Sequence, residues 1–270
     1  MGMVFTNLEM LMKRLLFIIS FLLFGTISLC NATLILFAGS TAGTPTSGAD
    51  PAVFTFLEGR YGAANVTYMQ TSAVTPLVAE GFDGVVVSST PGSGDIRNKF
   101  PNMNVGLINW EEAVMDSGGG EFGMSTVLMT KSTTTTMLSL APHPITAGLP
   151  SSITFATAGE TLNSASLFTG ITSIATALDG TGVGNSALFI AEAGDAVNPL
   201  AGTSGNIAPA RRVMFPITDN TFNTLTPEGL QLFGQAVDWI ANVDMIPEPG
   251  SGGLLVLGGL VVGVCRRLRG

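Results

Sequence analysis

The side chains that could carry out hydrolytic chemistry are few and widely spaced along this chain of 270 residues. His143 is the only histidine, so a Ser-His-Asp triad would have to use it. It stands between Pro142 and Pro144, and the chain has no Gly-x-Ser-x-Gly turn, the usual setting of an activated serine. We therefore predict a structural histidine that is hydrogen-bonded within its own loop. The alternative, an extracellular hydrolase of unknown substrate, would need Ser88, Glu111 and His143 to converge.

Metal and phosphate chemistry have little support in the sequence. One histidine cannot build a His-rich zinc site, and Asp195 and Asp219, which leave a carboxylate-only Mg²⁺ or Ca²⁺ site open, lack the alternating spacing of a calcium loop. The glycine-rich stretches 39–43 and 118–120 do not fit the Gly-x-x-x-x-Gly-Lys-Ser/Thr pattern, so we interpret them as surface loops. The sequence predicts no metal and no cofactor.

A ligand site, if there is one, is expected at the carboxyl ends of parallel strands, near the point where the strand order reverses. Trp110 beside polar groups could serve as a platform for a sugar ring, although a buried core position is the more common role of tryptophan. Glu111 and Glu112 are neighbours, about 100° apart on a helix, so they cannot form the facing acid pair of a glycosidase. The candidate ligand crevice consists of Gly39, Ser40, Ser88, Ser89, Asn109, Trp110 and Glu111.

The first half of the chain alternates between apolar strands and short helices. Continuous apolar runs of this kind are typical of parallel strands that are covered on both faces. Asp50 followed by Pro51 indicates an N-cap and the first helical position, and Gly62 ends that helix. This alternation predicts a parallel sheet with right-handed crossovers. The expected strands are 33–38, 65–69, 84–89 and 105–109, and the expected helices are 51–61, 76–80 and 96–100, with 110–115 leading into a further helix.

The second half has apolar runs that are shorter and separated by Gly-, Ser- and Thr-rich segments. We expect extended segments at 153–156, 174–178, 187–191 and 213–217, added to the sheet in antiparallel fashion. Thr226, Pro227 and Glu228 form a capping start for a final amphipathic helix that reaches Asn242. The whole pattern predicts one α/β domain over residues 33–244.

The first 32 residues have the features of a secretory signal peptide. Lys13 and Arg14 precede an apolar run from Leu15 to Phe24, and small residues follow at Cys30 and Ala32. The run is too short to cross a bilayer of roughly 30 Å comfortably. We therefore predict export from the cell, with cleavage by signal peptidase.

The last 26 residues contain a second sorting signal. Glu248 lies between Pro247 and Pro249, in a segment that the prolines keep extended. A Gly/Ser spacer, an apolar transmembrane run over 254–265 and a basic end follow in that order. This tail, residues 245–270, resembles the PEP-CTERM sorting signal. The resemblance implies export across the inner membrane of a Gram-negative bacterium and an exosortase as partner. It also implies transient membrane anchoring, followed by release at the cell surface or in an exopolysaccharide matrix. The basic end consists of Arg266, Arg267 and Arg269.

The part between the two signals is acidic and free of cysteine. It keeps six of the 11 Lys and Arg residues but 17 of the 19 Asp and Glu residues, and both cysteines, Cys30 and Cys265, lie outside it. An acidic surface argues against nucleic acid as a partner. The absence of cysteine excludes disulfides and cysteine nucleophiles from this domain.

Six segments of the domain, 34–39, 85–89, 105–111, 143–149, 211–213 and 225–239, form a recognisable set. On these segments the domain resembles the ThuA-like branch of the class I glutamine amidotransferase-like fold. The resemblance implies a flavodoxin-like sandwich of three layers. Amidotransferases of this class have a catalytic cysteine on a turn after a strand, and here the matching turn is Asn109-Trp110-Glu111, so amidotransferase activity does not carry over. We therefore expect a binding or structural module that is not an enzyme.

Overall fold

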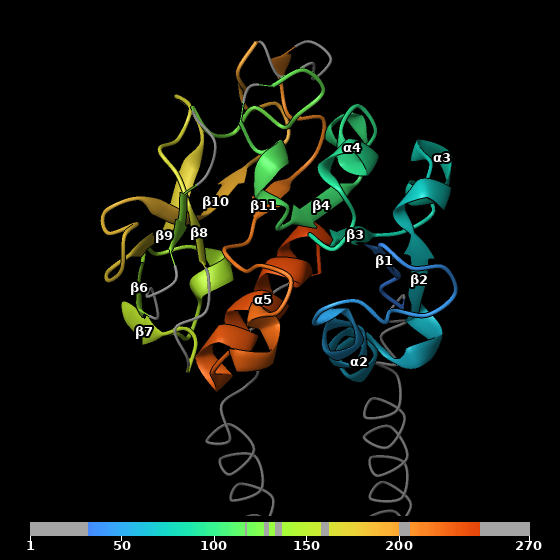
Figure 1. Ribbon diagram of the computed structural model, residues 1–270, viewed down its shortest axis with the longest axis horizontal. Helices are drawn as coiled ribbons and strands as arrows, with labels where there is room; N and C mark the ends of the chain where they lie inside the picture. The colour runs from blue at the N-terminus through green and yellow to red at the C-terminus, as the bar shows by residue number, and fades with distance from the viewer. Residues whose placement is uncertain are drawn as a thin grey trace, which may run out of the picture. The chain divides into compact units, whose positions relative to one another are not determined.

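The computed structural model describes residues 32–116, 118–126, 130–132, 137–157, 162–199 and 206–243. In this part of the chain a sheet of 9 strands runs in the order β2-β1-β3-β4-β11-β10-β9-β6-β7 (Figure 1). A second sheet pairs β5 (Thr130–Ser132) with β8 (Leu162–Ser164) in antiparallel fashion. The signal peptide and the sorting tail predicted from the sequence lie outside the described residues.

One half of the large sheet is parallel, as predicted. Its strands are β2 (Val66–Gln70), β1 (Ile35–Gly39), β3 (Gly84–Val87), β4 (Gly106–Asn109) and β11 (Arg212–Met214). This is the strand order of flavodoxin-like sheets, in which the chain reverses direction across the sheet between β1 and β3. The prediction that β11 is an antiparallel addition is wrong, because it pairs parallel to β4. A run of three buried residues gives no information about strand direction.

The other half of the sheet is antiparallel. It is built from β10 (Ser186–Ala191), β9 (Thr172–Ala177), β6 (Met137–Leu140) and β7 (Ser152–Thr154). The expected additions at three of these positions are confirmed, whereas β6 was not predicted. Its four residues alternate exposed and buried positions, a pattern too short to distinguish from a loop.

Two long helices flank the parallel half. The first is α2 (Asp50–Tyr61) and the second is α5 (Pro227–Ile240), whose N-cap Thr226 accepts a hydrogen bond from the backbone of Gly229 at 3.1 Å. They lie side by side, because Arg60 and Tyr61 of α2 both donate hydrogen bonds to Asp238 of α5. These contacts join two helices that are far apart in the sequence.

The remaining helices are single turns. They are α3 (Pro76–Ala79) and α4 (Ser93–Ile96). The predicted helix over 96–100 is wrong, since α4 ends at Ile96 and Asn98 takes a positive φ of 61°, which interrupts a helix. The helix expected over 110–115 is reduced to one 3-10 turn over Glu112–Val114.

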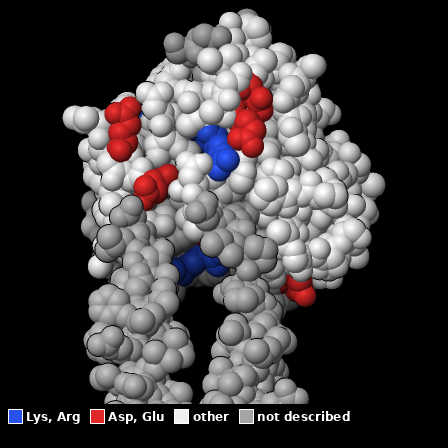
Figure 2. Space-filling model, turned by 180° about the vertical axis from the view of Figure 1, so that it is seen from behind, with Lys and Arg blue, Asp and Glu red and all other residues white. Residues whose placement is uncertain are grey.

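The surface of the described part carries few charges for its size. Figure 2 shows scattered acidic groups and a few basic ones on a face that is mostly uncharged. Within the described ranges, no helix has both the length and the hydropathy needed to cross a membrane.

Candidate functional site

The carboxyl ends of β1 and β3 meet at the reversal of strand order, where the sequence predicts a ligand crevice. Five polar residues gather here, and we call them the switch-point cluster: Asp50, Ser88, Ser89, Thr90 and Asp219. Asp50 begins α2, the two serines and Thr90 follow β3, and Asp219 comes from the loop after β11. Only the tertiary fold brings these three segments of the chain together.

The hydroxyl groups of the cluster are used to hold its carboxylates. Ser88 donates to Oδ1 of Asp50 at 2.5 Å, and Thr90 donates to Oδ2 of the same carboxylate at 2.7 Å. Ser89 donates to Oδ1 of Asp219 at 2.5 Å. The backbone carbonyl of Asp219 in turn accepts from the N–H of Ala49, at the start of α2. Ser88 and Ser89, predicted to face a ligand, therefore face carboxylates of the protein itself.

Asp50 is a carboxyl group buried beside a second acid. Its side chain is 1% exposed, and burial raises the pKa of this carboxyl, an effect opposed by the hydrogen bonds from Ser88 and Thr90 and reinforced by Asp219. The prediction that Asp50 caps α2 is wrong: the N-cap is Ala49, and no side chain caps this end. A carboxylate at a helix N-terminus occupies the position that a bound phosphate would take. The cluster therefore disfavours anions.

Gly39 and Ser40 complete this side of the site. A Cβ at Gly39 would lie 2.5 Å from Oη of Tyr68 and 2.8 Å from Oδ2 of Asp50, so only glycine fits here. Ser40 donates to Oγ of Ser47 at 3.0 Å. Both predicted crevice residues lie where expected, and their neighbours are side chains of the same domain.

The three predicted residues at the end of β4 and just after it make contacts within the domain. The side chain of Asn109 donates to the carbonyl of Glu111 and accepts from its N–H, both at 3.2 Å, which fixes the turn. Trp110 is 2% exposed and packs between Phe37 and Phe233, with ring centroids 6.3 and 6.1 Å away. The suggestion that Trp110 is a sugar platform is therefore wrong, because no face of its ring is open. Glu111 is buried at 9% exposure.

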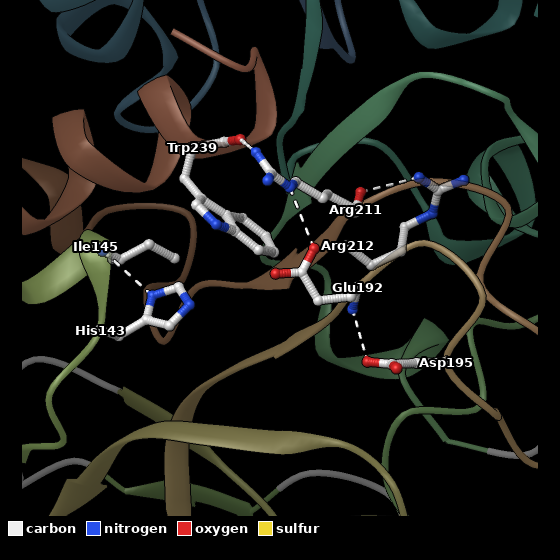
Figure 3. A network of polar contacts seen from close by, with 7 residues as sticks. All are labelled: His143, Ile145, Glu192, Asp195, Arg211, Arg212 and Trp239. Atoms are coloured by element: carbon white, nitrogen blue, oxygen red, sulfur yellow. Dashed lines mark hydrogen bonds and ion pairs between the residues drawn. The ribbon is translucent and has the colours of Figure 1, made fainter. Parts of the chain in front are cut away.

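His143 lies in a different part of the domain, and its ring is hydrogen-bonded within its own loop, as predicted. Its Nδ1 accepts a hydrogen bond from the N–H of Ile145 at 3.2 Å, and its ring packs edge-on against Trp239, 5.5 Å between centroids (Figure 3). Burial lowers the pKa of His143; Glu192 raises this pKa and Arg211 lowers it. Arg211 also lies 4.6 Å over the Trp239 ring. The imidazole thus packs against the edge-on Trp239 ring and bonds within its own loop.

The strand directions separate His143 from Ser88. His143 follows β6. Three antiparallel pairings, β6 with β9, β9 with β10 and β10 with β11, separate this strand from β11, which runs parallel to β4 and, through β4, to β3. β6 therefore runs antiparallel to β3. The end of β6 therefore lies at the opposite edge of the sheet from the end of β3. Ser88, Glu111 and His143 do not converge, and the arrangement that a hydrolase would need is not formed by these residues.

A pocket of about 540 Å³ opens at the amino ends of the parallel strands, a location that the sequence analysis missed. Glu80, Asp83 and Glu192 line it together with Arg211, which donates to Glu192 at 3.2 Å. Residues from five separate segments of the chain form this pocket, so no local motif marks it. The carboxylates give it an acidic lining.

The side chains of the switch-point cluster present hydroxyl and carboxylate oxygen atoms. No group of three or more His, Cys, Asp or Glu residues suited to a metal ion occurs in the described ranges. The site and the sheet define an α/β domain with flavodoxin-like strand order, whose switch point is filled by hydrogen bonds between its own side chains.

No family model and no curated protein matches this chain. Among solved structures it is similar to a cytoplasmic protein from Salmonella typhimurium, at 13% identity and a TM-score of 0.48, covering 77% of this chain and 98% of that chain. It is also similar to a ThuA-like protein from Bacteroides uniformis, at 10% identity and a TM-score of 0.46, covering 80% and 94%. Likenesses this distant carry no conclusion about activity or partners.

Proposed function

We propose that this protein is exported, sorted through its C-terminal PEP-CTERM signal, and delivered to the cell surface or extracellular matrix, where its ThuA-like α/β domain acts as a binding or structural module. The observation that carries the proposal is the order of the tail in the sequence. Pro247-Glu248-Pro249 comes first, then the apolar run 254–265, then the arginines at the end. The partners during processing are signal peptidase, the membrane and an exosortase, and exopolysaccharide is a candidate partner afterwards.

The contacts in the domain favour a module over an enzyme. The hydroxyl groups of Ser88 and Ser89 are held by Asp50 and Asp219, and the only imidazole is an acceptor within its own loop. In a Ser-His-Asp triad the imidazole must lie within hydrogen-bond reach of the serine, so that it can take the serine's proton. Because Ser88 and His143 lie at opposite edges of the sheet, these contacts give the hydrolase alternative no support.

The two ends of the described domain lie at the same edge of the sheet, as suits a domain held at a membrane by an anchor after α5. The N–H of Leu34 donates to Asp83 at 2.8 Å, and a Cβ at Gly84 would lie 3.2 Å from Cβ of Ala241 and 3.4 Å from Cδ1 of Ile35. The start of β1 and the end of α5 are therefore neighbours at the amino-end edge of the parallel strands. An anchor that continues from α5 would hold this edge toward the membrane and the opposite edge away from it.

The test is a substitution in the sorting motif. Glu248→Ala in the full chain, expressed in an exosortase-containing Gram-negative host, should leave uncut protein in the membrane fraction, whereas the parent chain is trimmed and leaves it. Ser251→Ala, in the spacer, is the matched control and should be processed like the parent. If Glu248→Ala were trimmed and released at the parental rate, the sorting assignment would be wrong.

A further inference from the structure

The pocket at the amino ends of the parallel strands combines a large volume with a mixed polar lining. Its volume of about 540 Å³ lies within the range of roughly 300–1,000 Å³ that is usual for small-molecule sites. Carboxylates, a guanidinium, a side-chain amide and a phenyl ring line it together. We call these side chains the rim groups of the pocket: Glu80, Phe82, Asp83, Asn104, Glu192 and Arg211.

Each carboxylate among the rim groups is held through one of its two oxygens. Oδ2 of Asp83 accepts from a backbone N–H just before β1 at 2.8 Å, and Oε1 of Glu80 accepts from the side chain of Asn104 at 3.4 Å. Oε2 of Glu192 accepts from Nε of Arg211 at 3.2 Å (Figure 3). Within the described part of the chain, the second oxygen of each carboxylate has no donor. The carboxylates are thus oriented by the protein and keep acceptor atoms for a ligand.

Arg211 provides hydrogen-bond donors beside these acceptors. Its Nη1 donates to the carbonyl of Trp239 at 2.7 Å, and its guanidinium lies 4.6 Å over the ring of the same tryptophan. A guanidinium has five N–H groups, so the bonds to Glu192 and Trp239 leave others for a ligand. The side chain of Arg211 is 31% exposed, which makes these groups accessible.

This lining fits a sugar unit better than an ion. A sugar hydroxyl both donates and accepts, so neighbouring hydroxyls can donate to a carboxylate and accept from a guanidinium or an amide. Phe82 is half-buried, and its ring offers an apolar surface for the C–H groups of a sugar ring. An anion would meet three carboxylates and one guanidinium that is already paired with Glu192. The described ranges contain no group of three or more residues suited to a metal ion.

We propose that this pocket binds a neutral sugar unit of a polysaccharide, whose hydroxyl groups donate to the carboxylates of the rim groups and accept from Arg211. The inference rests on the proposed function as a binding module and gives that module a site and a class of ligand. The site is separate from the switch-point cluster, which lies at the carboxyl ends of the strands. Binding involves no covalent step.

The test is isothermal titration calorimetry of the full chain, in a detergent without a sugar headgroup, with neutral hexasaccharides of glucose, mannose and galactose. At least one should bind with a Kd of about 1 mM or tighter. Spermidine and oligogalacturonate are the cationic and anionic comparisons. The proposal is overturned if none of the hexasaccharides binds, or if either charged compound binds more tightly than they do. This assay needs no processing of the tail, so its failure is distinguishable from failure of the sorting assignment.

Variants locate the binding in the pocket. Ala193→Trp, at an exposed position of the lining, occupies the pocket without removing a polar group and should weaken binding by at least about tenfold. Glu80→Ala combined with Glu192→Ala removes two acceptors and should have an effect of the same size. Glu58→Ala combined with Glu228→Ala is the matched control, with the same change of charge on α2 and at the start of α5. Parental affinity in either pocket variant, with an unchanged circular dichroism spectrum, would overturn the proposal.

Discussion

Replacing Arg212 with methionine should destabilise the domain strongly, although no carboxylate faces this residue in the contacts described. Arg212 begins β11 and is 2% exposed. Its guanidinium donates to the carbonyl oxygens of Val105 at 2.8 Å, Arg211 at 2.9 Å and Pro101 at 3.3 Å, and also to that of Met103. Burial lowers the pKa of Arg212 to about 9, so it stays charged at neutral pH. One buried cation thus connects β11 to the segment that leads into β4.

The expected cost follows from two opposing effects. A hydrogen bond to a charged donor contributes about 1.5–3 kcal/mol, and four carbonyl groups would lose theirs. Against this, methionine avoids the desolvation of a guanidinium, which costs several kcal/mol. We expect Arg212→Met to lower the free energy of unfolding by about 2–5 kcal/mol, or the Tm by about 5–15 °C for a domain of this size.

Thermal unfolding of the full chain in detergent, followed by circular dichroism, measures this loss. Arg212→Lys keeps the charge but not the planar set of donors, so it should recover less than half of the loss. Arg211→Met is the control, because the Arg211 side chain is 31% exposed and its removal should cost about 1 kcal/mol. If Arg212→Met were as stable as the parent chain, desolvation would outweigh the hydrogen bonds, and our reasoning about this site would be refuted.

Three further predictions concern stability. Asp238→Asn should lower the free energy of unfolding by about 1 kcal/mol, since it weakens the contacts with Tyr61 and with Arg60, whose side chain is 37% exposed; a loss above about 3 kcal/mol in urea unfolding would contradict this. Gly59→Ala should raise the free energy of unfolding by about 0.5–1 kcal/mol, because Gly59 lies within α2 with open space around the added methyl group. A variant with no gain in Tm would contradict this prediction. Burial lowers the pKa of His143, so its contribution to the free energy of unfolding is present above the ordinary pKa of 6.5 and is lost as the pH falls below 6.5. His143→Gln should flatten that part of the plot of stability against pH, and an unchanged plot would exclude His143 as the source of the pH dependence.

The candidate site was only partly predictable from the sequence. The topological rule located Gly39, Ser40, Ser88 and Ser89 at the switch point, and the structure brings them together there. The rule could not reveal that Asp50 fills the position, because a carboxylate beside a proline at a helix start has the same local pattern whether it caps the helix or reaches another strand. The acidic pocket at the opposite edge was missed for a similar reason, since its lining comes from separate loops.

The sequence by itself determined the elements whose information is local. Apolar runs of four to six residues mark β1 and β3, and Thr226-Pro227-Glu228 marks the start of α5, because caps and periodicity depend on neighbours in the chain. Only the tertiary structure decided the direction of β11, the burial of Trp110 and the partners of Arg212. Each of these depends on contacts between residues far apart in the sequence, and such contacts leave no periodic signal in either partner.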